Sequence, residues 1–532
     1  MRCKRLVSIA LPLALILLPA GCRKESASPD CTLVSFVVRK ADNPGLREDI
    51  SFSFDREKHT LKAMYLHWID GQDPKCLVAR YSIEGASATL DGKKVSGEKC
   101  TVDFSETVTF NVKAENGNST SYKITLNCPQ VNTELPVLRL QPSSPIVSRS
   151  KYVSAKATLY SPDTKKGWWK SEDGDIEVRG RGNSTWTLPK KPYRLRFPEK
   201  FSPIGLDHAS ERSWVILAHD MDKSLLRNHL AFALSRILFN PDEHRHDPSA
   251  IMFTPCSRFV NVYMDNEYHG VYQMSDQMGK GDGRIAVEKA GGHIIESDIH
   301  GSEAPPVRFN SAVKNIQFNH KYPDPEDPGA LKEYTAVETL IGQAEKALYG
   351  SSFTNPATGW RKYFDEKTLV DYIIVKELAG DMDGYTSTYL YKRSGVDKLF
   401  FGPIWDVDKG WDNEKRGGEG YLDKLMIHSG FHMPVFVSDD WFNRFWQDPS
   451  LRQAVKLRWK QKKMELLDAV YGELDTMPHK MEKAIEANFS VWPFYYQASG
   501  EAKMPSQDYP SEIARIRSLT ASRAATLDKL FN

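Results

Sequence analysis

The stretch that decides the fold is residues 379–413, AGDMDGYTSTYLYKRSGVDKLFFGPIWDVDKGWDN. Two runs within it, residues 386–392 and 398–405, are rich in the aromatic and β-branched side chains that favour strands. Residues 393–397 between them have the composition of a turn. The order of strand, short turn and strand predicts a β-hairpin.

Aspartates stand at both open ends of this hairpin. Asp383 precedes the first strand, with Asp381 just before it, and Asp406 and Asp408 follow the second strand. Because antiparallel strands begin and end side by side, we expect these carboxylates to share one small volume. Carboxylates that close raise each other's pKa unless a cation neutralises them, and oxygen ligands in this number suit Mg²⁺, Mn²⁺ or Ca²⁺. The alternative is that they are ordinary turn and capping residues.

The hairpin resembles the core signature of a known family. Asp383, the Tyr-Leu-Tyr-Lys run at 389–392 and the Gly-Pro-Ile-Trp-Asp-Val-Asp run at 402–408 are similar to motifs of the spore coat protein H (CotH) family of atypical secreted protein kinases. The resemblance implies that Asp383 is the catalytic aspartate. It also implies that Asp406 and Asp408 bind a divalent metal, in the role of the metal-binding aspartate of other kinases.

The chain departs from the family pattern at one metal position. Family members often carry asparagine five residues after the first aspartate, like the catalytic loop of other kinases, and this chain carries Thr388 there. A hydroxyl is a weaker metal ligand than an amide carbonyl. The resemblance therefore implies a weakened second metal contact at Thr388, and it leaves open a catalytically inactive member of the family.

A second predicted hairpin supplies basic residues. Residues 175–180 and 190–197 read as strands around a glycine-containing turn. The two-residue period puts Lys191 on the face of Tyr193, Leu195 and Phe197, with Arg194 and Arg196 on the other face. A lysine among apolar neighbours needs an anionic partner such as phosphate. The alternative is a lysine at a sheet edge with its amine in solvent.

This second hairpin resembles the nucleotide-binding hairpin of the same family. The resemblance implies an ATP site, and the Asp-Lys-Ser-Leu-Leu-Arg-Asn run at 222–228 is also similar to the family's pattern. That run opens an amphipathic helix predicted to reach about residue 238, with Asp222 as its N-cap. The Gly-x-x-x-x-Gly-Lys pattern of a Walker P-loop is absent. The residues that the resemblance assigns to ATP are Arg179, Arg181, Asn183, Ser184, Lys191 and Arg227, the last with an ordinary helix-surface arginine as its alternative.

The N-terminus carries an export signal. Residues 1–21 combine a basic start with a short apolar run, and Cys22 follows small residues, which is typical of a bacterial lipoprotein signal with Cys22 lipidated. An ordinary cleaved signal peptide is the alternative. Residues 22–30 form a polar tether, and no later run reaches the ~18 apolar residues of a membrane helix. We therefore expect a lipid-anchored protein of the bacterial cell envelope.

The cysteines cluster near the start of the mature chain. In an oxidising compartment Cys31, Cys76, Cys100 and Cys128 can form two disulfides, with three possible pairings. Their spacing does not match a zinc ribbon. Cys256 stands alone and is interpreted as a buried core thiol.

The remaining patterns predict an α+β protein of two domains. Short alternating strands over residues 31–130 favour an immunoglobulin-like β-sandwich, acting as a spacer or binding a partner. Residues 135–532 form the kinase-like domain, in which we expect an irregular segment at 301–330. Asp276 and Glu296 are candidate polar groups facing the site. Helical periodicity is found at residues 331–348, 366–378, 441–474 and 509–530, the last two completing a C-terminal helical layer.

Charge and resemblance together limit the function. Lysine and arginine total 71 against 69 aspartates and glutamates, and no basic block is present, so nucleic acid is not an expected partner. The resemblance implies transfer of phosphate from ATP, with Mg²⁺ or Mn²⁺, to Ser or Thr of an exported protein. One alternative keeps the fold without the chemistry, as an adhesin or a module that binds Ca²⁺, glycan or protein. Another is a glycoside hydrolase that uses two of the carboxylates.

Overall fold

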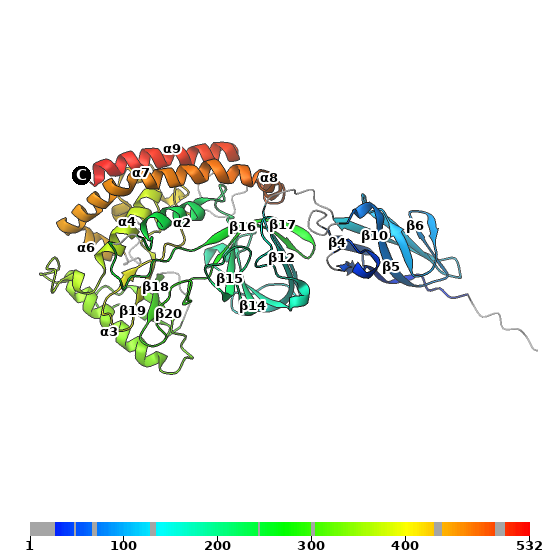
Figure 1. Ribbon diagram of the computed structural model, residues 1–532, viewed down its shortest axis with the longest axis horizontal. Coiled ribbons are helices and arrows are strands. Elements are labelled where there is room, and N and C mark those ends of the chain that lie inside the picture. The colour runs from blue at the N-terminus through cyan, green and yellow to red at the C-terminus, as the bar shows by residue number, and fades with distance from the viewer. Residues whose placement is uncertain are drawn as a thin grey trace, which may run out of the picture. The chain divides into compact units, whose positions relative to one another are not determined.

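The computed structural model describes eight segments of the chain: residues 27–46, 49–65, 72–127, 135–242, 245–298, 304–429, 439–494 and 506–531. The predicted signal, Cys22 and Cys128 lie outside these residues. The chain divides into two compact units, residues 1–129 and 130–532 (Figure 1).

The first unit is built from short strands with alternating burial. In β9, for example, Val108, Phe110 and Val112 are buried while the residues between them are not, so one face of the strand contacts the core. Two sheets, ordered β2-β1-β5-β8 and β3-β4-β10-β9-β6-β7, share this apolar core. The strands are β1 (Thr32–Val38), β2 (Ile50–Ser51), β3 (Ser53–Asp55), β4 (Thr60–Met64), β5 (Leu77–Glu84), β6 (Ser87–Leu90), β7 (Lys93–Val95), β8 (Lys99–Val102), β9 (Val108–Lys113) and β10 (Ser119–Asn127).

The predicted disulfides are not found among the described cysteines of this unit. Cys31, Cys76 and Cys100 are free thiols. The Cys31 thiol lies 3.1 Å from the Thr120 hydroxyl, and burial raises the pKa of the Cys100 thiol to about 11. The prediction of two bridges is therefore corrected for any pairing among these three residues.

The second unit begins with a closed seven-stranded barrel in the order β11-β12-β13-β14-β15-β17-β16. In β14 the side chains of Tyr193, Leu195 and Phe197 are buried in the barrel core, whereas those of Arg194 and Arg196 are only partly buried. The two-residue period predicted this division. The strands are β11 (Val137–Pro142), β12 (Val153–Tyr160), β13 (Ile176–Gly180), β14 (Tyr193–Phe201), β15 (Glu211–Leu217), β16 (Ser257–Met264) and β17 (Glu267–Asp276).

A five-stranded sheet follows, ordered β19-β20-β18-β21-β22, and it contains the predicted central hairpin. Leu390 pairs with Phe401 and Tyr391 with Phe400. The second strand is shorter than predicted because Pro403 has no backbone N–H to continue the ladder. The strands are β18 (His293–Asp298), β19 (Arg308–Asn310), β20 (Gln317–Tyr322), β21 (Ser387–Lys392) and β22 (Phe400–Phe401), so the expected irregular segment at 301–330 in fact holds two strands.

Helices complete the second unit, and the protein is an α+β protein as predicted. The long helices α7 and α9, orange and red in Figure 1, run side by side, and α7 also packs on α2 and α4. No helix in the described segments is both long enough and apolar enough to cross a membrane. The helices are α2 (Arg227–Leu238), α3 (Ala330–Tyr349), α4 (Glu366–Ala379), α5 (Met426–Ser429), α6 (Asp439–Trp446), α7 (Pro449–Lys480), α8 (Glu482–Val491) and α9 (Tyr509–Leu530).

Candidate functional site

A cleft of about 1330 Å³ collects residues from the barrel, from the central sheet and from the loop after β22. Its lining is strongly charged, which distinguishes it from the largely apolar pockets that bind most small molecules. The basic residues are Arg149, Arg179, Arg181, Lys190, Arg194, Arg196, Lys321 and Lys409, and the acidic residues are Asp220, Glu296, Asp383, Asp406 and Asp408. Both halves of the predicted site therefore open into one space.

Asp383 enters the cleft from the loop between α4 and β21. The helix ends at Gly380, whose φ of 62° is one that glycine adopts at low cost, and the chain then turns toward the sheet. The Asp383 carboxylate pairs with the Lys409 ammonium at 2.5 Å, and its side chain is 25% exposed. The carboxylate thus faces the cleft in a fixed orientation, with one oxygen held by a cation.

Asp406 and Asp408 lie in the loop after β22. Asp406 has a left-handed backbone (φ 57°), which aspartate tolerates better than most residues. The amide of Val407 between them donates to the Asn228 side-chain oxygen at 2.8 Å, which fixes the loop to helix α2. This anchoring gives the two aspartates defined positions at the cleft.

The fourth aspartate of the cluster, Asp381, is fully buried and does not line the cleft. Lys376 on α4 donates to one Asp381 oxygen at 2.9 Å and to the Trp405 carbonyl at 3.0 Å. Burial lowers the pKa of Lys376, but its acidic neighbours, Asp381 first, outweigh burial and raise the pKa to about 12. One buried ammonium therefore connects the segment before the hairpin with the segment after it.

The environment of Asp406 and Asp408 fits a divalent cation. The Asp406 side chain is exposed in the cleft. The surrounding protein nevertheless replaces much of the bulk water around its carboxylate, and this raises the pKa of Asp406. Withdrawal from water and then repulsion by Asp406 raise the pKa of Asp408 well above its usual range. A bound cation would reverse both effects. Magnesium is commonly held by one or two carboxylates together with substrate phosphates and water, so two aspartates suffice.

The basic side of the cleft is the outer face of β13, β14 and their connecting turn. Burial, followed by the repulsion of Arg179, Arg196 and Arg181, lowers the pKa of Arg194. Burial also lowers the pKa of Arg181, whose guanidinium lies 5.6 Å from the centre of the Trp405 ring. Several guanidiniums that repel one another in a confined space are stabilised by a polyanion. This group fits the phosphates of a nucleotide.

Three further predicted residues line the cleft on the turn between β13 and β14, or beside it. Arg179 donates to the Arg149 carbonyl, and Asn183 accepts a hydrogen bond of 2.9 Å from the Arg149 guanidinium. Ser184 starts a short 3-10 turn, Ser184–Thr187. Arg149, Arg194 and Arg196 were given no role in the sequence analysis, although the two-residue period already separated the last two from the core.

The structure places Lys191 differently from the prediction. Its ammonium donates to the carbonyls of Trp186 at 2.8 Å and Leu188 at 2.9 Å, and Lys191 is not part of the cleft lining. Its neighbour Lys190 lines the cleft, but the Lys190 ammonium donates to the Val271 carbonyl at 2.6 Å and the Asn488 side chain at 2.8 Å. Burial lowers the pKa of Lys190 well below its usual value. The phosphate-binding assignment of Lys191 is therefore corrected.

Arg227 is also corrected. It is fully buried and pairs with Asp222 at 2.6 Å and Glu512 at 2.8 Å, so it is neither a phosphate ligand nor a surface arginine. The guanidinium also donates to the carbonyls of Gly410 and Trp411, just beyond the loop that carries Asp406 and Asp408. The Asp222 carboxylate accepts hydrogen bonds from the guanidinium and from the backbone amide of Arg227. Helix α2 begins at Arg227, later than predicted, and Asp222 is not its N-cap.

Thr388 does not face the cleft. Its hydroxyl lies 3.1 Å from the buried Tyr372 hydroxyl, and the residue is not part of the lining. The expected weak metal contact is thus corrected to a core hydrogen bond. Of the two candidate polar groups, Glu296 lines the cleft and pairs with Lys321 at 2.8 Å, whereas Asp276 is buried elsewhere.

The chain matches a model of a known protein family. Residues 178–527 match the family described as CotH kinase protein. The matched range contains the basic hairpin, helix α2, the acidic hairpin and most of the helical layer. No curated protein matches the chain.

Proposed function

This chain belongs to the CotH kinase family, and from that premise we propose that it transfers phosphate from ATP, with a divalent cation, to Ser or Thr of exported proteins. The observation that carries the proposal is the composition of the charged cleft. Arginines that repel one another and aspartates with raised pKa values line the same space, and a nucleotide with its cation complements both groups.

The proposed roles follow from the contacts. Arg181 and Arg194 bind and orient the phosphates of the nucleotide, because both arginines line the cleft among other cations. Asp406 and Asp408 hold Mg²⁺ or Mn²⁺, and the bound cation supplies charge neutralisation at the phosphates. Asp383 accepts a hydrogen bond from the acceptor hydroxyl and orients it toward the phosphate.

Lys409 is a positioning residue in this scheme. Its ammonium lies 2.5 Å from one Asp383 oxygen and 3.7 Å from Glu414, so it fixes the rotamer of the aspartate from the side of the metal-binding loop. The second Asp383 oxygen is 3.9 Å from an Arg416 nitrogen. These contacts restrict Asp383 to one orientation, which favours a preorganised acceptor site.

The proposal includes the cellular setting. We propose that the mature chain is lipidated at Cys22 in the bacterial envelope and meets its substrate there, with no role for nucleic acid. The apolar signal followed by this cysteine supports the proposal.

A phosphorylation assay tests the reaction. Purified protein with Mn²⁺ or Mg²⁺ and radiolabelled ATP is expected to label itself or casein, and Asp383→Asn and Asp406→Asn are expected to abolish the label. Asp397→Asn, in the exposed turn of the same hairpin, is the matched control and is expected to label like wild type. Equal labelling by wild type and Asp383→Asn would refute the assignment.

One observation favours a second candidate, a catalytically inactive module that binds Ca²⁺, glycan or protein. Thr388 is turned into the core, so the cleft lacks the second metal ligand that family members often have at this position. Calorimetry with wild type and Asp406→Ala separates the two functions. Only the kinase predicts ATP binding that requires a divalent cation and is lost with Asp406.

A further inference from the structure

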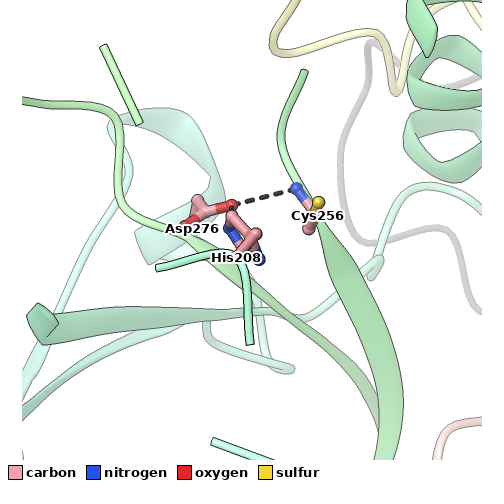
Figure 2. A group of neighbouring side chains, drawn as sticks. All are labelled: His208, Cys256 and Asp276. Carbon is pink, nitrogen blue, oxygen red and sulfur yellow. Dashed lines mark hydrogen bonds and ion pairs between the residues drawn. The ribbon is translucent and has the colours of Figure 1, made fainter. Parts of the chain in front are cut away.

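A second group of ligating side chains lies outside the cleft, at one end of the barrel (Figure 2). Cys256 directly precedes β16, Asp276 is the last residue of β17, and His208 lies in the connection between β14 and β15. Their ligand atoms, one sulfur, one nitrogen and one oxygen, all lie within 4.8 Å of one another. Side chains from three separate segments thus converge on a single point.

The carboxylate at the centre of this group is firmly held. Figure 2 shows the Cys256 backbone nitrogen donating to Asp276 Oδ2, at 2.9 Å, with His208 beside the carboxylate. His208 Nε2 lies 2.8 Å from the same oxygen. Arg284 donates to the other oxygen, Oδ1, at 2.6 Å, and its guanidinium lies 4.5 Å from the centre of the Trp214 ring. Both carboxylate oxygens are therefore held in place, Oδ1 by Arg284 and Oδ2 by His208 and the Cys256 amide.

We propose that His208, Cys256 and Asp276 form a binding site for one zinc ion. Thiolate and imidazole are ligands that zinc accepts at tetrahedral sites and that Mg²⁺ and Mn²⁺ bind poorly, while a carboxylate completes a set of three. The hydrogen bond from Arg284 to Oδ1 is the outer contact that commonly orients a ligating carboxylate. Because the His208 side chain is 25% exposed, solvent reaches the group and supplies water as the fourth ligand.

The site differs in selectivity from the acidic cleft. The acidic pair in the cleft, Asp406 and Asp408, offers carboxylate oxygens, whereas this group offers sulfur, nitrogen and oxygen. The two sites are adjacent in the sequence, because Gln277 lines the cleft and directly follows Asp276. Zinc at this place would connect the start of β16 to the end of β17 and fix the strand end that leads into the cleft. The proposal goes beyond phosphate transfer and does not depend on it.

The sequence analysis separated these residues. It interpreted Cys256 as a buried core thiol, and the residue is partly buried against the barrel core. It expected Asp276 to face the cleft, which is wrong because Asp276 is not part of the cleft lining. His208 received no role, since the three residues are far apart in the sequence and no metal-binding spacing links them.

Cobalt substitution tests the proposal on the full mature chain. One equivalent of Co²⁺ is expected to give the sulfur-to-metal charge-transfer band of a thiolate ligand, and Zn²⁺ is expected to remove the band by displacement. Cys256→Ser is expected to abolish the band and to weaken Zn²⁺ binding, measured against a chromophoric chelator, by at least about tenfold. Cys76→Ser, which removes an exposed thiol of the first unit, is the matched control and is expected to keep both.

A second measurement uses the wild-type protein alone and does not rely on a variant that folds. Zn²⁺ is expected to slow the alkylation of Cys256 by iodoacetamide while leaving Cys76 unaffected, as quantified by mass spectrometry of the two peptides. A charge-transfer band that survives Cys256→Ser, or equal alkylation of Cys256 with and without Zn²⁺, overturns the proposal. Binding lost equally in Cys76→Ser would also overturn it, since the metal would then be bound by a different set of thiols.

Discussion

Replacing Arg227 by methionine tests whether this residue stabilises the fold or binds ATP. The substitution keeps much of the apolar volume but removes the partner of two carboxylates, Asp222 and Glu512, that are at most 1% exposed. Breaking a buried ion pair by removing one partner costs about 3–5 kcal/mol. Asp222 keeps the Ser224 hydroxyl and Glu512 keeps Arg515, so we expect the lower end, about 3 kcal/mol.

Equilibrium unfolding in urea, followed by tryptophan fluorescence, measures this loss. The control is Arg236→Met on the same helix, because Arg236 is 42% exposed and its contact with Glu473 is 3.9 Å long. Such a surface pair contributes at most about 1 kcal/mol. We expect a clear fall in the urea midpoint for Arg227→Met alone, with unchanged ATP affinity of the folded protein. An unchanged midpoint combined with lost ATP binding would refute the structural role and restore the phosphate-binding one.

Two further predictions concern the core. Burial lowers the pKa of His320 to about 4, so the unfolded chain binds a proton below pH 6.5 that the folded protein does not. Between pH 6.5 and pH 4 the unfolding free energy of wild type should fall by about 3 kcal/mol more than that of His320→Phe. This variant keeps an aromatic ring stacked on Tyr334. Urea titrations measure both profiles, and parallel pH profiles would contradict the prediction. Thr388→Asn introduces the residue that is common in the family. It should not raise kinase activity, because the side chain at this position does not reach the cleft. It should lower the free energy of unfolding by about 1 kcal/mol, because it breaks the hydrogen bond to Tyr372. A gain in labelling of casein by this variant would contradict the observed orientation.

Local patterns predicted the elements that depend on neighbouring residues. Helix α9 was expected at 509–530 and has these bounds, since helical periodicity is visible over six turns. The convergence of Asp383, Asp406 and Asp408 on one cleft followed from the geometry of a hairpin, whose open ends must lie together.

Contacts between distant segments escaped prediction. The barrel closes through a parallel pairing of β11 with β16, over 120 residues apart, and no local pattern specifies such a pair. The ion pair of Arg227 with Glu512 joins residues that are even farther apart, 285 positions in the sequence. Lys191 was misplaced for a different reason: strand β14 begins at Tyr193, after Pro192, so the two-residue period did not extend back to the lysine.

The buried Lys376 holds together the two open ends of the hairpin formed by β21 and β22. The position of Asp406 relative to Asp383 is set by a contact below the strands, from helix α4 to the Trp405 carbonyl and to Asp381, and not by the reverse turn near Gly395. Insertions at that exposed turn should therefore leave the reacting groups in place. The turn is a permissive position at which a peptide tag or a reporter dye can be attached without altering the dimensions of the cleft.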